Sequence, residues 1–414
     1  MENIPYWKKS ICYAYKSDIG MRRSNNQDSY GFRIARTLQQ WLTRGHLFVV
    51  ADGMGAHAAG EVASKMAVDI VMQSYLKRTN ETPVKALEHA IMDAHNRIRE
   101  RSRREDVFHD MGTTCDAFAL TPQGIIIAHV GDSRVYRIRT NRIEQMTFDH
   151  SLVWEICELS KLPYDCPPSH IPKNQITRSL GPIENLQVDI EGPHQIMVGD
   201  IFLSCSDGLT GQVKDYEIGE IVTVFPPDLA AETLINITNL RGGPDNTTIV
   251  IVQTTRDDAT EQEVDEGMKM PTQSKILICV TIILTTIFLT ASFLGNFILG
   301  GVFGFVAAVV AVWFFVSAKS YLFGNATFVN TEIHGKAPYT SSFCQPEEKL
   351  TNSLAQMLAE VKQAINSKSI KISSKEANNT EQKAILALKN KNYADAIRNY
   401  AMSINLLMRE LKKI

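Results

Sequence analysis

The chain has 414 residues, enough for two or three domains, and a formal net charge of −2. A charge so close to neutral gives no electrostatic case for nucleic acid, so that class of partner is not expected. The seven cysteines are scattered without a CxxC pair, which argues for reduced thiols and against a zinc site or a disulfide framework.

In chain order, the first 254 residues predict an α/β region, because short apolar runs alternate with turn residues and with helical periodicity. The expected strands are Ile11–Tyr15, Ser29–Ile34, Leu47–Ala51, Thr114–Leu120, Ile125–Val130, Val135–Arg139, Ile143–Met146, Phe202–Cys205 and Thr248–Val252. The expected helices are Ala58–Tyr75, Pro83–Arg103 and Asp228–Leu240. The short turns between strands favour antiparallel pairing, so we expect a β-sandwich flanked by helices.

Residues 257–275 have low hydrophobicity and predict an acidic linker. Residues 276–318 contain no charged side chain, and their two apolar runs, separated by Gly295-Asn296, would each be about 30 Å long as helices. This pattern predicts a two-helix transmembrane hairpin. Lysines flank it, so the positive-inside rule predicts a two-pass protein of the cell (inner) membrane, with the N-terminal domain and the tail in the cytoplasm.

Residues 319–346 predict a further linker and 347–414 a helical tail. Within the tail, residues 380–412 predict two helices around a turn at Asn390-Lys391-Asn392. They resemble a single tetratricopeptide motif, with a plain helical hairpin as the alternative. The small and aromatic positions of that motif are Ala384, Tyr393, Ala396, Tyr400 and Ser403. One such motif cannot bury its own face, so we expect it to pack on the preceding helix, on a second copy or on a protein partner.

Five aspartates lie where a strand begins or ends beside Gly, Ser or Asn: Asp28, Asp52, Asp132, Asp207 and Asp245. Each alone is an ordinary turn residue. Gathered at one edge of a sandwich, they would concentrate negative charge, which is costly unless cations neutralise it. Hard cations such as Mg²⁺ and Mn²⁺ bind carboxylate, carbonyl and water oxygens, so the pattern points to such ions.

Eight ordered stretches give a specific resemblance to the metal-dependent protein serine/threonine phosphatases of type 2C, the PPM family, in its bacterial form. They read SDIGMRRSNNQDSYG, VVADGMGAHAAGEVAS, MGTTCDAFAL, AHVGDSRVYRIR, MTFDHSLV, ITRSLG, FLSCSDGLTGQV and GGPDNTTIVIV. The resemblance implies an α+β fold, a four-layer α-β-β-α sandwich over residues 1–256. It also implies two Mn²⁺ or Mg²⁺ ions in a cleft at one sheet edge, with a third, looser ion in bacterial members.

The resemblance assigns roles by position in these motifs. Metal binding falls to Asp52, the Gly53 carbonyl, Asp207 and Asp245, with Asp28 beside the site and Asp132 on the third ion. Arg23 matches the phosphate-binding arginine, and Asn246 would support Asp245 from outside the ligand set. The implied chemistry is attack on phosphorus by a water molecule. Two metal ions, both held by Asp52, would bridge this water and make it more acidic.

Three departures from the family bear on this site. Met54 stands where eukaryotic relatives have a histidine thought to protonate the leaving group, Ala56 replaces a glycine, and Gln27 replaces a glutamate. His57 and His150 are nearby, and we expect each to be structural or to lie just outside the ligand set, and not to donate the proton. None of the departures removes a principal metal ligand, so we expect an active enzyme. Residues 151–173 fall where the family has a flap beside the cleft.

The leading hypothesis is a membrane-tethered phosphatase that acts on phosphoserine and phosphothreonine proteins and opposes a cognate serine/threonine kinase. One alternative is a non-catalytic sensor or scaffold in which the fold only binds a partner, although the intact acidic set argues against it. Another is an enzyme governed by its tail, through self-association or through recruitment of a substrate.

Overall fold

The computed structural model describes residues 10–55, 59–164, 171–172, 175–255, 283, 286, 332–370, 373 and 375–413. Met1–Arg256 and Ile333–Ile414 form one compact unit, and Asp257–Glu332 form a second. The predicted hairpin at 276–318 lies outside the described residues, apart from Ile283 and Thr286.

The predicted membrane location is corrected by the structure. In the part of the chain that the structure describes, no helix is long and apolar enough to cross a membrane. The long helices that the structure describes, such as α4 (Pro83–Arg104) and α14 (Tyr393–Leu411), carry charged side chains and bury their apolar faces within the protein. The two-pass membrane prediction is therefore not retained.

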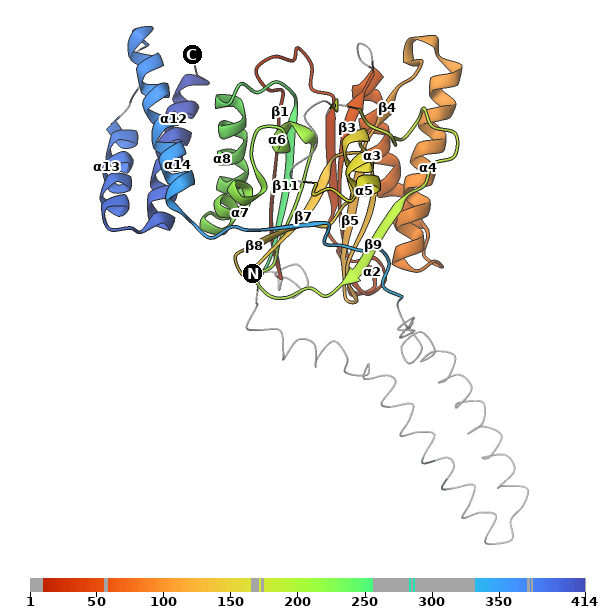
Figure 1. The fold of residues 1–414 in the computed structure, drawn as a ribbon. Helices are drawn as coiled ribbons and strands as arrows, with labels where there is room; N and C mark the ends of the chain where they lie inside the picture. The colour runs from red at the N-terminus through yellow and green to blue at the C-terminus, as the bar shows by residue number, and fades with distance from the viewer. Residues whose placement is uncertain are drawn as a thin grey trace, which may run out of the picture. The chain divides into compact units, whose positions relative to one another are not determined.

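Two antiparallel sheets form the centre of the first unit (Figure 1). The first sheet has the order β1 (Ile11–Asp18), β11 (Thr247–Thr254), β10 (Ile201–Cys205), β7 (Arg134–Arg139), β8 (Arg142–Gln145) and β12 (Thr340–Phe343). The second has the order β2 (Asp28–Arg33), β3 (His46–Met54), β5 (Cys115–Thr121), β6 (Gly124–Val130) and β9 (Asp189–His194), and β4 (Gly112–Thr113) pairs with β3.

Strand β3 shows why the sheets stack. Its side chains point alternately to opposite faces, as the two-residue period of a strand requires. Phe48 and Val50 join the core between the two sheets, whereas Leu47, Val49 and Ala51 join the core beneath the helices on the other face. Both faces are thus buried, which explains why β3 reads in the sequence as a continuous apolar run.

Helices cover the outer face of each sheet. The helices α3 (Ala59–Lys77) and α4 (Pro83–Arg104) pack on the second sheet, and α7 (Asp215–Val224) and α8 (Pro227–Leu240) pack on the first. Figure 1 shows the resulting α-β-β-α order from α8 to α4. The predicted sandwich flanked by helices is confirmed. The sequence did not predict α7, α2 (Leu38–Arg44) or β9.

The tail forms three helices, α12 (Glu348–Ser367), α13 (Lys375–Lys389) and α14 (Tyr393–Leu411). One apolar cluster continues from the first sheet through α7 and α8 into these helices, and includes Ile218, Ile235, Leu354 and Ile404. The side chain of Asn405, buried in this interface, accepts a hydrogen bond from Asn236 and donates one to Thr233, both at 2.8 Å. The tail is therefore a fifth layer on the sandwich, as Figure 1 shows.

The tetratricopeptide resemblance gains no support from this arrangement. Tetratricopeptide helices stack on neighbouring repeats. Here α14 instead packs on α12 and α13 and on α7 and α8 of the same chain. The expected need for a packing partner is met by the preceding helix and by the sandwich.

A short strap precedes the tail and joins the two sheets at their edge. His334 bridges to Gly192 of β9 in the second sheet, and β12 extends the first sheet by pairing with β8. Glu191 holds the strap by accepting hydrogen bonds from the backbone N–H of Lys336 and Ala337 and from the Tyr339 hydroxyl, at 3.1, 3.0 and 2.6 Å. Part of the expected linker at 319–346 is therefore ordered structure.

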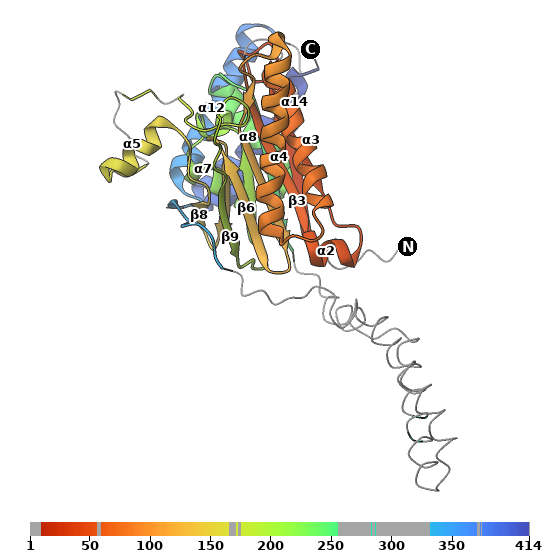
Figure 2. The same cartoon turned by 90° about the vertical axis from the view of Figure 1, so that its right-hand side faces the viewer.

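The region expected to be a flap begins with a helix, α5 (Leu152–Ser160), which stands off the body in Figure 2. Ser151 caps it by accepting a hydrogen bond from the Trp154 N–H. The Pro-rich end at 165–170 lies outside the described residues. A cluster of Trp154, Phe148, Tyr164 and Tyr339 anchors α5 to the body.

Candidate functional site

The five predicted aspartates come from five strand ends. Asp28 begins β2 and lies directly opposite Asp52 of β3 in the antiparallel register. Asp132 lies in the turn between β6 and β7, Asp207 begins the short helix α6 (Asp207–Thr210) after β10, and Asp245 lies in the turn before β11. Besides burial, the charges of Asp28, Asp207, Asp132 and Asp245 all act to raise the pKa of Asp52, so the fold brings all five together.

Close backbone contacts explain the glycines that follow two of these aspartates. A Cβ atom on Gly53 would lie 2.1 Å from the carbonyl oxygen of Gly60, at the start of α3. A Cβ atom on Gly208 would lie 2.0 Å from the carbonyl oxygen of Asn246. Only glycine allows this approach, so the Asp-Gly pairs let strand ends and helix starts meet at one point.

The four buried carboxylates at this edge, Asp28, Asp52, Asp132 and Asp207, resist ionisation because their pKa values are raised. Burial, reinforced by Asp207 and Asp245, raises the pKa of Asp28 to about 6. Burial, reinforced by Asp207, raises the pKa of Asp132 to about 8, and burial together with Asp28 raises that of Asp52. One buried oxygen of Asp28 and one of Asp132 also have no hydrogen-bond partner. The site thus concentrates oxygen acceptors and negative charge that lack compensation from the protein.

This donor set fits divalent cations. Among the described residues, no three His, Cys, Asp or Glu side chains form a closed set of metal ligands. Mg²⁺ does not need such a cage, because it keeps several waters and binds through one or two carboxylates. The orphaned oxygens of Asp28 and Asp132 have the chemistry that hydrated Mg²⁺ or Mn²⁺ prefers.

Arg23 reaches the same edge from the loop between β1 and β2. Its Nη2 donates to Oδ2 of Asp245 at 2.6 Å, and its side chain is 51% exposed. A half-exposed guanidinium beside the carboxylates offers a planar set of donors for phosphate oxygens. The structure therefore brings the predicted phosphate-binding arginine together with the predicted metal ligands.

Asn246 holds the Arg23 loop in place. Its side-chain amide donates to the carbonyl oxygens of Ile19 and Asn25 at 2.9 and 3.0 Å, and its Oδ1 accepts from the backbone N–H of Gln27 at 2.8 Å. The sequence predicted that Asn246 supports Asp245. In the structure the backbone N–H of Asn246 donates to Oδ1 of Asp245 at 2.8 Å, and its side chain clamps both ends of the loop that carries Arg23.

The predicted structural role of His150 agrees with its surroundings. His150 is fully buried, its Nδ1 accepts from the Gly131 N–H at 3.0 Å, and its Nε2 lies 2.9 Å from Oδ2 of Asp189. Burial lowers the pKa of His150 to about 4, so the ring is neutral and braces the turn that carries Asp132. Ala56 and His57 lie outside the described residues.

Arg134 lies beside the site, and no pattern in the sequence indicated its contacts there. Its guanidinium forms a two-point contact with Asp149, with Nε and Nη2 at 2.9 and 2.7 Å from Oδ2. It also lies over the Trp154 ring of α5, 5.5 Å from the centroid. Arg134 thus connects the turn of Asp132 with the helix of the flap. The GDSR stretch contained this arginine, but nothing in the sequence paired it with Asp149 or Trp154.

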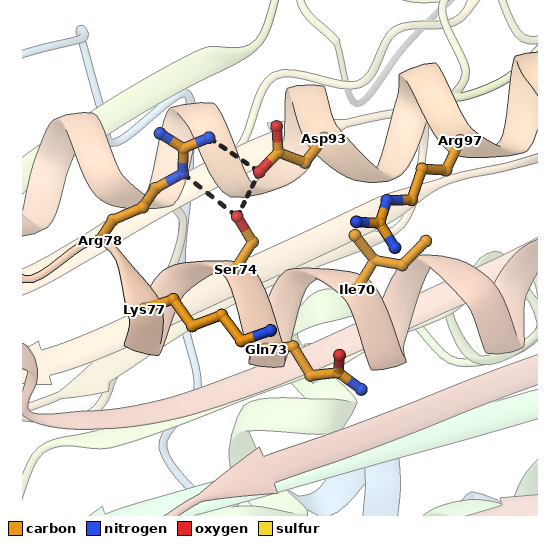
Figure 3. A pocket seen from close by; sticks show the side chains of 7 residues that line it. All are labelled: Ile70, Gln73, Ser74, Lys77, Arg78, Asp93 and Arg97. Atoms are coloured by element: carbon orange, nitrogen blue, oxygen red, sulfur yellow. Dashed lines mark hydrogen bonds and ion pairs between the residues drawn. The ribbon is translucent and has the colours of Figure 1, made fainter.

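A pocket of about 240 Å³ between α3 and α4 lies apart from these residues (Figure 3). Three of its polar side chains satisfy one another: Ser74 donates to Asp93, and Arg78 donates to Asp93 at 2.8 Å and to Ser74 at 3.2 Å. None of the predicted site residues lines it. We therefore assign no function to this pocket.

Comparison with known proteins matches the chain to one family. A family model described as Protein phosphatase 2C matches residues 21–151. Protein phosphatase PhpP of Streptococcus pneumoniae is 35% identical over 250 residues, which cover 59% of this chain and 97% of that protein. Two solved structures, the serine/threonine phosphatases of S. agalactiae and Mycobacterium tuberculosis (PstP/Ppp), are 33% and 30% identical, with TM-scores of 0.52 and 0.51. Each match covers 59% of this chain and 99% of the solved chain. The chain therefore belongs to the protein phosphatase 2C family and is a protein serine/threonine phosphatase.

Proposed function

We propose that the carboxylate edge is the active site and that it hydrolyses phosphoserine and phosphothreonine in proteins. The observation that carries the proposal is that Arg23, paired with Asp245, also feels the charges of Asp52 and Asp207, two buried carboxylates whose pKa values are raised by burial and by neighbouring carboxylates. A site that holds this much negative charge cannot attract a phosphate dianion unaided. It becomes a phosphate site once cations neutralise it.

Two divalent ions, Mn²⁺ or Mg²⁺, would be held by Asp52, Asp207, Asp245 and the Gly53 carbonyl, with Asp28 alongside. Asp132, at the turn braced by His150, would hold a third. When bound, such ions stabilise the charge on phosphoryl oxygens and make water acidic enough to act as a nucleophile at neutral pH.

The residues of the chain position the substrate. Arg23 would bind two phosphate oxygens through its fork of N–H donors, and Asn246 would keep the loop of Arg23 at the distance this requires. Met54 cannot donate a proton to the leaving serine or threonine oxygen. That proton would therefore come from water.

The test is phosphate release from a phosphothreonine peptide by the purified full-length chain with Mn²⁺. We expect Asp207→Asn and Asp245→Asn to lose at least about a hundredfold in kcat/KM, because each removes a ligand charge. Asp69→Asn, at a half-exposed aspartate on α3 paired with Lys65, is the matched control and should keep full activity. A folded wild-type protein that binds the peptide but releases no phosphate would be a sensor and not an enzyme, and a fully active Asp207→Asn would misplace the site.

We further propose that the phosphatase reverses the action of a serine/threonine kinase of the same cell. The support is that the same phosphorylated side chains are the product of such a kinase and the substrate of this site. Deletion of the gene should raise the phosphorylation of the kinase's substrates. Expression of the wild-type protein should lower it again, and expression of the Asp207→Asn protein should not.

A further inference from the structure

A groove of about 650 Å³ lies where the tail meets the catalytic sandwich. One wall is β1, with Tyr30 of β2 beside it, a second wall is α8, and the third is the end of α14. The similarity to the phosphatases named above covers 59% of this chain, against 97–99% of theirs. The helical tail, and with it the third wall, lies outside that match.

The β1 wall of the groove is the edge of a sheet. Strand β1 lies at the end of its sheet, and within the described part of the chain it pairs with β11 alone. The Thr255 N–H donates to the Ser10 carbonyl at 2.8 Å, which fixes the alternation of the antiparallel ladder. The backbone N–H and C=O groups of Tyr13, Tyr15 and Ser17 consequently point away from β11, towards any strand that adds to this edge.

The side chains around this edge suit an acidic peptide. The groove lining contains four basic side chains and two acidic ones. Both acidic groups are already paired, Glu232 with Arg409 of α14 and Asp18 with Lys412 at 3.3 Å. Lys413 pairs with Glu410 just outside the lining, so among the described residues Lys16 of β1 is the basic side chain of the lining that has no ion pair.

The groove also adjoins the active site. Asp18 ends β1 and accepts a hydrogen bond at 3.0 Å from the N–H of Gly20, at the start of the loop that carries Arg23. Tyr30 lies two residues along β2 from Asp28, which is about 7 Å of strand. Tyr15, which is 42% exposed, packs on Tyr30 with ring centroids 4.8 Å apart. A peptide with its phosphorylated residue at the carboxylate edge can therefore continue into this groove.

We propose that the groove binds an extended, acidic segment of the phosphoprotein substrate, next to the phosphorylated residue, and that this segment adds to β1 as a strand. Main-chain hydrogen bonds to Tyr15 and its neighbours supply affinity, and the positive charge of Lys16 favours acidic side chains. The inference rests on the proposed function, because it assigns the substrate class of the same active site.

The first test uses three phosphothreonine peptides: a short core, the core with a glutamate-rich extension, and the core with a glutamine-rich extension of equal length. Turnover is measured with Mn²⁺ on the full-length chain. We expect the acidic extension to raise kcat/KM above the glutamine extension by about threefold or more, and Lys16→Glu to abolish that preference. Lys389→Glu, an exposed lysine on α13, is the matched control and should retain it.

The second test separates the backbone from the side chain. Tyr15→Pro removes an N–H that faces away from β11, whereas Tyr15→Ala removes the same ring and keeps that N–H. We expect Tyr15→Pro to lower kcat/KM for both extended peptides several-fold below Tyr15→Ala, with the two variants equal on the short core.

The possible outcomes separate the two proposals. The short core may be hydrolysed while wild type and Lys16→Glu show the same ratio of kcat/KM for the glutamate-rich and glutamine-rich peptides. In that case the docking groove is refuted and the phosphatase assignment stands. Equal turnover of the extended peptides by Tyr15→Pro and Tyr15→Ala overturns the strand addition. If folded wild-type protein hydrolyses no peptide with Mn²⁺, the proposed function itself fails.

Discussion

Glu220 on α7 gives a pH dependence that tests the packing of the tail. Its side chain is buried at 2% exposure, and its Oε2 accepts a hydrogen bond from the backbone N–H of Glu347, at the start of α12, at 3.3 Å. Burial raises the pKa of Glu220 to about 7. The charges of Glu347 and Glu217 act in the same direction, and the Glu347 N–H and Lys349 oppose them. Cys344 also faces this carboxyl.

The sign and size of the effect follow from the two protonation states. In the unfolded chain Glu220 has its ordinary pKa of 4.5, so between pH 4.5 and 7 the folded protein binds the extra proton. The free energy of unfolding therefore falls as pH rises through this window. A difference of about 2.5 pKa units corresponds to about 3 kcal/mol, fully present below pH 4.5 and lost above pH 7.

The perturbation is Glu220→Gln, which keeps an oxygen to accept from the Glu347 N–H but carries no charge. We expect urea unfolding of the variant to lie within about 1 kcal/mol of wild type at pH 5 and to show about 3 kcal/mol more stability at pH 8. Glu360→Gln, an exposed glutamate on α12, should show no such pH-dependent gain. An equal difference between wild type and Glu220→Gln at both pH values would refute the reasoning.

Three further substitutions test other parts of the account. Asn246→Ala should lower kcat/KM about tenfold to a hundredfold and weaken inhibition by inorganic phosphate, because the Arg23 loop loses its clamp; unchanged phosphate inhibition would contradict that role. Asn405→Ala should cost about 1–3 kcal/mol in urea unfolding, since it leaves buried partners on α8 unsatisfied; no loss would show that the tail is not docked as described. Asp116 and His129 form a buried pair at 2.5 Å. Asp116→Ala should therefore cost about 3–5 kcal/mol, and adding His129→Leu should recover part of it; additive losses would contradict the pairing.

The parts of the fold that depend on local pattern were predictable from the sequence. β3 and β5 are buried on both faces and appear as apolar runs, and α4 shows helical spacing in Ala86, Ala90, Ala94 and Ile98. The Asp-Gly pairs were also visible, because close backbone contacts restrict those positions to glycine. In each case the residues that form the pattern are only a few positions apart in the sequence, so the pattern is visible there.

The features that the sequence did not reveal depend on distant contacts. Asn405 and Asn236 are 169 positions apart, so the docking of the tail on α8 leaves no local trace. The clamp made by Asn246 consists of hydrogen bonds to main-chain carbonyls, which any residue can supply. The five aspartates were foreseen as a set, whereas the burial that raises the pKa values of Asp28 and Asp132 depends on the packed sandwich.

Calorimetric titration of Mn²⁺ into the full-length chain, beside Asp52→Asn and Asp207→Asn variants shown to be folded, tests the central claim most directly. The account predicts that wild type binds at least two ions at the carboxylate edge and that each substitution removes or markedly weakens at least one. Absence of Mn²⁺ binding by the wild type, or the same stoichiometry and affinity in both variants, would contradict it.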